Sequence, residues 1–186
     1  MAIADVFVRD DIITEPTYGR FSVCHDHSCQ TVVTLSLSLS EWDQITSPLQ
    51  PASIAASDER AAIATAVSTM ETVVGRLTGT DADKGGNIKG FGQAGQMDCI
   101  DESTNTSTYM NMLAGDGLLQ HHSVADRSTR FGIFAGMPHT TAVIRENVSG
   151  KLFAVDSWFF DNGKAPAIIE MQEWKAGWDP VGATSE

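Results

Sequence analysis

The sequence predicts an α+β fold in which a cysteine-bearing helix packs on a mostly antiparallel sheet. Short alternating segments open the chain, two helical patterns follow, and the C-terminal half returns to strand-like alternation. With 186 residues, 42% of them hydrophobic, the chain is long enough for one sizeable core. We therefore expect a single domain over residues 1–186, with strands and a short helix in 1–56 and the main core in 57–186.

The N-terminal segment is expected to form two strands on either side of the sequence CHDHSC. Residues 21–23 form the first strand, and residues 31–39 form the second, in which leucines alternate with serines. Ser40 is the expected N-cap of a short helix, because an acidic residue follows it three positions later. Two prolines then mark a loop.

Two longer helices are expected in the middle of the chain. Ser57 is the expected N-cap of the first, which runs to about residue 77 with two acidic residues in its first turn. The second begins near Cys99 and ends at Gly115 or Gly117. The apolar stripe of the first helix consists of Ile63, Val67, Met70, Val74 and Leu77.

The C-terminal half alternates as a sheet does. A tight turn at 147–150 is expected to join two of its strands, and a short helical piece at 172–178 closes the chain. The expected strands are 118–124, 130–136, 139–146, 151–158 and 165–171.

Charge and composition exclude several classes of function. The net charge is −12 and no cluster of basic residues offsets it, so a nucleic-acid partner is disfavoured. No apolar run is long enough for a membrane span. The N-terminal residues lack the features of a signal peptide, so a cytoplasmic protein is the default, and a periplasmic or secreted one is expected if a leader was removed. The sequence gives no indication of the oligomeric state.

Cys99 lies in the segment GQMDCIDES, at the expected start of the second helix. A helix N-terminus favours a thiolate, because its free N–H groups and its dipole attract negative charge. The negative charges of Asp98 and Asp101 disfavour a thiolate at Cys99 unless their carboxylates point elsewhere. Cys99 is therefore a candidate nucleophile, and a buried, inert cysteine is the alternative.

A cysteine nucleophile needs a base, and His139 has the most favourable position among the five histidines. It opens an expected strand, and Asp156 ends the next one. If the turn at 147–150 is tight, antiparallel pairing brings both residues to the same end of the sheet. Asp156 would then orient the imidazole, as the acid does in other triads. A histidine bonded to the backbone and an aspartate that begins a turn are the structural alternatives.

An acyl-transfer site also needs N–H donors for the developing oxyanion. The backbone N–H of Cys99 is one candidate. The side-chain amides of Gln93 and Gln96, in the glycine-rich loop before it, are two others. Solvated loop glutamines are the structural alternative for both.

The segment CHDHSC is a second cluster of residues that could bind a metal or form a disulfide. It contains Cys24, His25, His27 and Cys29, whose thiolates and imidazoles would suit zinc or copper. A disulfide between the two cysteines, in an oxidising compartment, is a second interpretation. A hairpin tip with reduced thiols and exposed histidines is a third.

These motifs resemble the transglutaminase-like cysteine peptidase superfamily, and its bacterial branch most closely. The resemblance covers residues 60–158: a glycine precedes Asp-Cys-Ile-Asp at 98–101, and a His-x-x-x-Val motif, a hairpin and a Val-Asp pair follow. It implies a papain-like core in 57–186, with Cys99 as nucleophile, His139 as general base and Asp156 as the orienting acid. Met97 before the motif and the Ser-Trp pair after Asp156 depart from the family's pattern.

The resemblance also bears on ions and on a rival family. Some bacterial relatives depend on calcium, which makes Asp98, Asp101 and Glu102 candidate ligands. The NlpC/P60 cell-wall peptidases share an Asp-Cys pair at a helix start, but their small residues after the cysteine are replaced here by Ile100-Asp101. We rank that family second.

The expected function is a thiol hydrolase or acyltransferase that acts on a peptide or isopeptide amide through a thioester. The resemblance favours hydrolysis over transfer to an amine, because most bacterial relatives are hydrolases. The expected partner is a protein or peptide substrate; no cofactor is required, and zinc or calcium are the candidate ions. The alternative is a non-enzymatic binding or metal-carrying protein organised by the CHDHSC cluster, with Cys99 inert.

Overall fold

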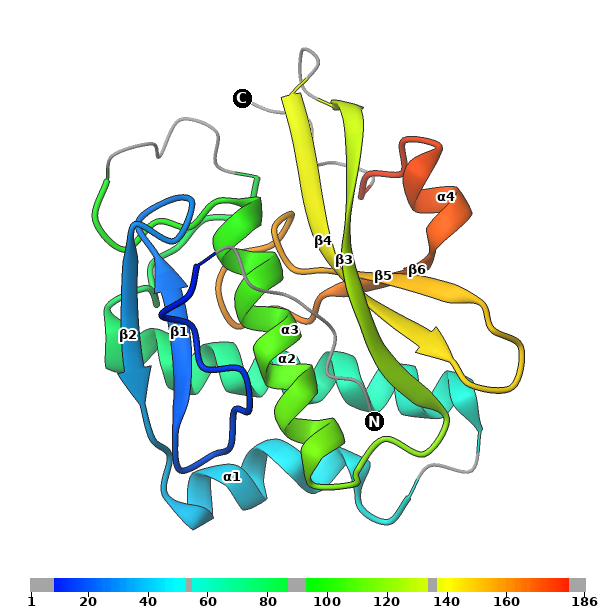
Figure 1. Cartoon of the computed structure of the whole chain (residues 1–186), viewed down its shortest axis with the longest axis horizontal. Coiled ribbons are helices and arrows are strands. Elements are labelled where there is room, and N and C mark those ends of the chain that lie inside the picture. Colours follow the sequence, from blue (N-terminus) through cyan, green and yellow to red (C-terminus); the bar gives the residue numbers. More distant parts are fainter. Residues whose placement is uncertain (1–8, 53–54, 87–92, 134–136, 181–186) are drawn as a thin grey trace.

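The computed structural model describes residues 9–52, 55–86, 93–133 and 137–180. Helices are combined with two antiparallel sheets in this part of the chain, one of two strands and one of four (Figure 1). The α+β class predicted from the sequence is therefore confirmed. The middle of the glycine-rich loop, residues 87–92, lies outside the described residues, as do residues 134–136 of an expected strand.

The two-stranded sheet carries the CHDHSC segment at its turn. Strand β1 (Phe21–His25) pairs with β2 (Thr31–Leu35) in an antiparallel register that puts His25 opposite Thr31. The second strand is shorter than the sequence pattern predicts, because the chain leaves the sheet after Leu35 to begin a helix.

The first helix begins earlier than expected, and Ser38, not Ser40, is its N-cap. In helix α1 (Leu39–Thr46), the Ser38 hydroxyl accepts a hydrogen bond from the Glu41 N–H, and the Glu41 carboxylate accepts one from the Ser38 N–H at 2.8 Å. This reciprocal capping box satisfies two N–H groups at once and fixes the start of the helix. A short 3₁₀ helix, η1 (Ser47–Leu49), follows.

Helix α2 (Ala56–Thr78) is the long helix that the apolar stripe predicts. The predicted cap is wrong: Ala55 is the N-cap and makes no side-chain bond, while Ser57 lies within the first turn. The stripe is buried except for Leu77, which is 51% exposed in the last turn. Gly79 ends the helix in the left-handed conformation that glycine adopts without strain.

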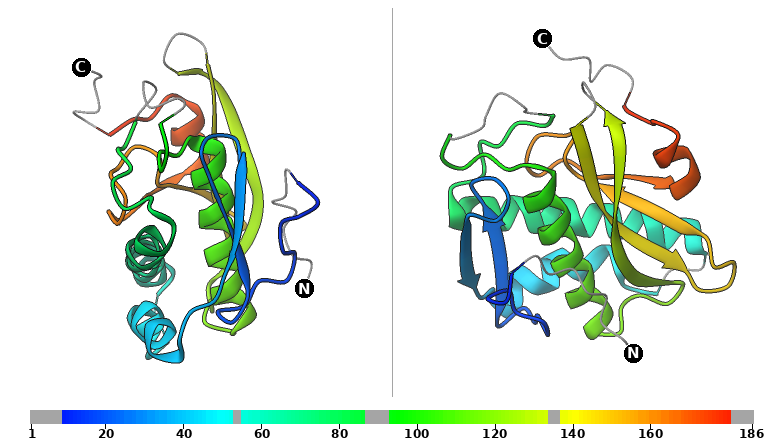
Figure 2. Two further views of the ribbon diagram at one scale, coloured as in Figure 1. Left: turned by 90° about the vertical axis from the view of Figure 1, so that its left-hand side faces the viewer. Right: turned by 45° about the horizontal axis from the view of Figure 1, so that its top comes forward.

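Helix α3 (Cys99–Gly115) lies at the centre of the molecule and is buried on every side from residue 101 to residue 110. Figure 2 shows it between α2 and the strands. Many of its buried side chains are hydroxyls that bond within the helix or to its neighbours. Thr108 donates to the Thr104 carbonyl, and the Thr106 and Ser157 hydroxyls lie 3.1 Å apart. These bonds allow a polar helix to occupy a buried position.

The four-stranded sheet has the order β3-β4-β5-β6, and all its pairs are antiparallel. Its strands are β3 (His122–Ile133), β4 (Met137–Glu146), β5 (Leu152–Asp156) and β6 (Ala167–Glu170). The sequence predicted two strands, at 118–124 and 130–136, where the structure has one. Residues 125–129 continue the pairing with β4 through a register irregularity, so the polar segment between the two predicted strands does not interrupt β3.

The turn at 147–150 is confirmed. The Glu146 N–H donates to the Lys151 carbonyl at 2.8 Å, and Gly150 has a φ of 72°. The turn sets the register in which Ala142 faces Val155, and this register brings the start of β4 toward the end of β5. A short helix, α4 (Met171–Lys175), follows β6 where a helical piece was expected.

One hydrophobic cluster joins the two parts of the chain. It contains Phe21 and Trp42 from the N-terminal part, Ile63 of α2, Leu113 of α3 and Ile144 of the sheet. Cutting the chain at residue 57 would divide this core. No helix among the described residues combines the length and the apolar character that crossing a bilayer requires.

Candidate active site

Cys99 is the first residue of α3, as the sequence predicts. Asp98 is the N-cap and accepts hydrogen bonds from the N–H groups of Ile100 and Asp101, both at 3.0 Å. Cys99 is partly exposed and is the chain's one free cysteine. The local chemistry of the Asp-Cys-Ile-Asp motif therefore fixes where the helix begins and where the thiol lies.

The surroundings of Cys99 keep it in the neutral thiol form at rest. Burial raises its pKa to about 11, and the charges of Asp98 and Asp156 act in the same direction. The backbone N–H of Thr140 opposes this rise in pKa. Asp156 and the Thr140 backbone both act on the pKa of Cys99, and helix α3 packs against β4, the strand that bears His139.

His139 and Asp156 are hydrogen-bonded to each other, as the hairpin topology predicts. The distance from His139 Nε2 to Asp156 Oδ2 is 2.7 Å, and both side chains are buried. A carboxylate accepts hydrogen bonds, so Nε2 carries the proton when the imidazole is neutral and Nδ1 is the basic nitrogen. Within the described part of the chain, Nδ1 has no hydrogen-bond partner.

Aromatic rings enclose the His139 imidazole. The ring centroids of Trp158, Phe159 and Trp174 lie 4.9, 5.2 and 5.7 Å from it. Trp174 also donates its indole N–H to Asp156 Oδ2 at 2.7 Å. The sequence analysis did not identify this role of Trp174, because nothing in the local pattern of the short terminal helix indicates a partner in β5.

A left-handed turn lies on the other side of the Cys99 motif. Asp26, His27, Ser28 and Cys29 have φ values of 66, 67, 53 and 53°. Residues other than glycine rarely adopt this conformation, which costs about 1–2 kcal/mol each. Four in succession therefore need compensating interactions.

The carboxylates of Asp98 and Asp101 provide those interactions. The N–H groups of His27 and Cys29 donate to the two oxygens of Asp101, at 2.8 and 2.6 Å, and the Ser28 N–H donates to Asp98 at 3.0 Å. Successive N–H groups on one side of such a turn form an anion-binding nest. The two acids beside Cys99 are therefore directed toward this turn and are hydrogen-bonded there.

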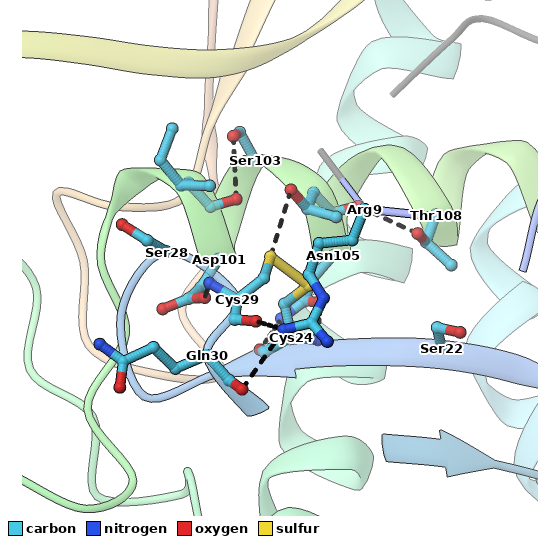
Figure 3. Close-up of a disulfide and its surroundings, with 12 residues drawn as sticks. Arg9, Ser22, Cys24, Ser28, Cys29, Gln30, Asp101, Ser103, Asn105 and Thr108 are labelled. Atoms are coloured by element: carbon cyan, nitrogen blue, oxygen red, sulfur yellow. Dashed lines mark hydrogen bonds between the residues drawn. A yellow bond between two sulfur atoms is a disulfide. The ribbon is translucent and has the colours of Figure 1, made fainter. Parts of the chain in front are cut away.

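The turn is closed by a disulfide between Cys24 and Cys29 (Figure 3). Asn105 of α3 makes two hydrogen bonds to the backbone of Cys24. The side-chain oxygen of Asn105 accepts from the Cys24 N–H at 2.7 Å, and its side-chain NH₂ donates to the Cys24 carbonyl at 2.8 Å. Arg9 donates to the Cys29 carbonyl at 2.8 Å. The second interpretation of the CHDHSC segment, a disulfide, is the one that the structure has.

The disulfide bears on the predicted metal site. Sulfurs that are bonded to each other have no thiolate charge to offer, so Cys24 and Cys29 are not metal ligands in this state. His25 Nδ1 lies 2.9 Å from an oxygen of Asp26, and His27 is buried. A site made of Cys24, His25, His27 and Cys29 would require reduction of the disulfide.

The three acids proposed as calcium ligands do not form one cluster. Among the described residues, the one group of three ligating side chains whose donor atoms all lie within 4.8 Å is Cys24, Cys29 and Asp101. The Asp98 and Asp101 carboxylates accept backbone hydrogen bonds, whereas Glu102 is buried near Asp83. Asp98 and Asp101 are thus engaged with the turn at residues 26–29, and calcium binding stays an expectation from the resemblance.

A group of buried carboxyls lies beneath the motif. Burial raises the pKa of Glu71 to about 8, that of Asp83 to about 6 and that of Glu102 well above its usual range. The charge of Asp83 adds to the rise in the pKa of Glu71 and of Glu102, whereas a hydrogen bond with Glu102 opposes the rise for Asp83. The Asp83 carboxylate accepts from the Met97 N–H at 2.9 Å, and Glu71 accepts from the Gly163 N–H at 3.2 Å. The sequence analysis did not identify this group, whose members lie far apart along the chain.

The two glutamines proposed as oxyanion donors differ in position. Gln93 is exposed. Gln96 is buried, and its side chain bridges the loop at 82–84 by donating to the Ala82 carbonyl at 3.2 Å and accepting from the Lys84 N–H at 3.4 Å. Gln96 thus holds the loop that precedes α3.

Comparison with known proteins gives no independent assignment. No protein-family model, no curated protein and no solved structure matches this chain.

Proposed function

We propose that the protein is a thiol hydrolase or acyltransferase in which Cys99 attacks the carbonyl carbon of an amide. One observation carries the proposal: helix α3 opens with Cys99 and packs against β4, the strand from which His139 bonds to Asp156. The bond from His139 to Asp156 supports the assignment of base and orienting acid.

The proposed reaction begins from a neutral thiol. Because the pKa of Cys99 is raised to about 11, we expect no preformed thiolate, and His139 Nδ1 removes the thiol proton as the sulfur attacks. The new S–C bond pushes the carbonyl electron pair onto oxygen. Collapse of this intermediate breaks the C–N bond, and the imidazolium returns its proton to the departing amine. Water then hydrolyses the thioester, or an amine accepts the acyl group.

Asp156 serves this sequence by its charge and its position. It stabilises the imidazolium that forms when His139 takes the proton, and it fixes which nitrogen faces the thiol. The backbone N–H of Cys99 at the start of α3 is the proposed oxyanion donor, since helix N-termini leave such groups free. Gln93 is a second candidate for this role. Gln96 is a weaker candidate, because its side chain already bonds the loop at 82–84.

The proposal includes a papain-like arrangement of the core. It is supported by a helix that opens with the cysteine and packs against β4, the strand that bears the histidine. A peptide or isopeptide is the proposed substrate class, and this part of the proposal comes from the resemblance of the motifs to transglutaminase-like peptidases.

We also propose that the protein works in an oxidising compartment, such as the periplasm or the cell exterior. The disulfide that closes the left-handed turn supports this, because thiols are kept reduced in the cytosol. Alkylation of cysteines in intact cells, before and after reduction, tests it. We expect one alkylated cysteine before reduction and three afterwards; three before reduction would contradict the proposal.

An active ester provides the test of function without knowledge of the natural substrate. Incubation with p-nitrophenyl acetate should release p-nitrophenolate in a burst and leave one acetyl group on the protein, located on Cys99 by peptide mass analysis. Cys99→Ala should abolish the burst. An unmodified Cys99 in a folded protein would contradict the proposal and favour the non-enzymatic alternative.

A further inference from the structure

We infer that Trp174 is a positioning residue of this site, which acts on His139 through Asp156. The inference rests on the proposed function. Trp174 is fully buried in α4, and its indole N–H donates to Asp156 Oδ2 at 2.7 Å. His139 Nε2 engages the same oxygen, also at 2.7 Å.

Two N–H donors on one oxygen fix the carboxylate. Rotation of the Asp156 side chain would break both bonds at once, so the indole determines which oxygen faces the imidazole. The rings of Trp158, Phe159 and Trp174 enclose the imidazole, so the hydrogen bonds to Asp156 Oδ2 are made inside a largely aromatic surrounding. Trp174 therefore sets the direction of the imidazole and, through it, of the basic nitrogen.

Arg130 holds Trp174 in place and links it to the strand pair that carries His139. Its guanidinium lies 4.3 Å from the centre of the indole ring and donates to the carbonyls of Trp174 and Trp178. Arg130 is also the cross-strand neighbour of His139 in the pairing of β3 with β4. Helix α4 is thus connected to Asp156 through the Trp174 indole and to the strand pair of His139 through Arg130.

The chemistry gives a specific expectation for loss of the indole donor. A carboxylate that has lost one donor attracts the imidazolium more strongly, so the imidazole keeps its proton to higher pH. The imidazole is also held less firmly, and its misalignment slows the proton transfer from the Cys99 thiol. A purely structural tryptophan would change stability without moving the pH dependence.

The test compares Trp174→Phe with the matched variant Trp178→Phe. Trp178 belongs to the same aromatic cluster, in which its ring packs edge-on against Phe159 at 5.8 Å. The rate of Cys99 acetylation by p-nitrophenyl acetate is measured against pH, and folding is checked by near-ultraviolet circular dichroism. For Trp174→Phe we expect a loss of about tenfold in rate and a midpoint about 0.5 pH unit higher. Trp178→Phe should keep the wild-type midpoint, and the same midpoint for both variants would overturn the inference.

A second measurement uses the wild-type protein, in case Trp174→Phe does not fold. The indole N–H signal of Trp174 is followed by NMR through a pH titration, together with the ring signals of His139. We expect the two residues to titrate with one midpoint; an indole signal that stays constant while His139 titrates would overturn the inference. If wild-type Cys99 is not acetylated, the proposed function fails, and the titration still decides whether Trp174 is coupled to His139.

Discussion

Two buried histidine–carboxylate pairs lie at opposite ends of the pairing between β3 and β4, and their different surroundings separate a structural pair from a candidate catalytic one. His122 Nδ1 lies 2.9 Å from Glu59 Oε1, and His139 Nε2 lies 2.7 Å from Asp156 Oδ2. All four side chains are buried. The residue types and the distances of the two pairs are nearly the same.

The second ring nitrogen distinguishes them. His122 Nε2 lies 3.2 Å from an Arg60 nitrogen, which can only donate, so both nitrogens of His122 are engaged. Glu59 also accepts hydrogen bonds from the backbone N–H groups of residues 120, 121 and 122. No such partner faces His139 Nδ1 among the described residues, and the backbone N–H of the neighbouring Thr140 acts on the pKa of the Cys99 thiol.

A buried histidine–carboxylate pair therefore does not by itself indicate catalysis. The pair at Glu59 connects α2 to the start of β3, and its polar atoms bond to one another and to Arg60. The pair at Asp156 leaves Nδ1 of His139 without a hydrogen-bond partner among the described residues. What faces the second nitrogen decides what a histidine can do.

The largest expected effect is on reactivity, and it should separate the two histidines. His139→Ala should slow acetylation of Cys99 by about 100-fold or more, because it removes the general base. His122→Ala should leave the rate within about threefold of wild type if the variant is folded, since His122 has no role in proton transfer. The measurement is the p-nitrophenolate burst. Equal losses in both variants would contradict the assignment of His139 as the general base.

The next effect is on stability, where a change in the Glu59 pair should cost more than a change in the Asp156 pair. Glu59→Gln replaces one acceptor oxygen by an NH₂ group that faces backbone donors, and should lower the free energy of unfolding by about 2–4 kcal/mol. Asp156→Asn keeps an oxygen for His139 and Trp174 and should cost less than about 2 kcal/mol while reducing the acetylation rate. Urea unfolding measures both, and a larger loss of stability for Asp156→Asn would contradict the assignment.

A smaller effect is expected from the disulfide, which contacts neither pair. The double variant Cys24→Ala, Cys29→Ala should lose about 2 kcal/mol of stability, the contribution expected for closing so short a loop. Acetylation of Cys99 should slow by less than about tenfold, because the N–H groups that hold Asp98 and Asp101 become less ordered while His139 stays in place. If this variant lost as much activity as His139→Ala, the site would depend on overall stability and not on the pair.

The last expected effect is on the pH dependence of stability and concerns a buried acid without a histidine partner. The pKa of Glu71 is raised from 4.5 to about 8, so between these values the folded chain holds a proton that the unfolded chain has lost. Stability should therefore fall as pH rises through this window, by at most about 1.4 kcal/mol per pH unit for one proton. Glu71→Gln should reduce the slope, while the exposed Glu173→Gln should leave it unchanged. Urea unfolding between pH 4.5 and 8 measures it, and an unchanged slope in Glu71→Gln would assign the proton to Asp83 or Glu102.

Much of the fold could be predicted because its signals are local. The apolar stripe of α2, the acid that caps α3 and the turn at 147–150 depend on residues a few positions apart. The errors are local too: Ser38 and Ser40 both resemble caps, and only the bond from Glu41 back to Ser38 decides between them. Residues 125–129 are mostly polar and separate two predicted strands, but their pairing with β4 makes them part of β3.

In the candidate site, too, some features follow from local sequence and others follow from tertiary packing. The position of Cys99 at a helix start and the approach of His139 to Asp156 follow from a cap and a hairpin, so the sequence alone determined them. Packing of the whole chain decided what surrounds them. The turn that binds Asp98 and Asp101 lies 70 to 74 residues away in sequence, and Trp174 reaches Asp156 across 18 residues that include a strand and a helix start. Local hydrogen bonds select a conformation over a few residues, whereas these partners meet only after the core has fixed the relative positions of distant elements.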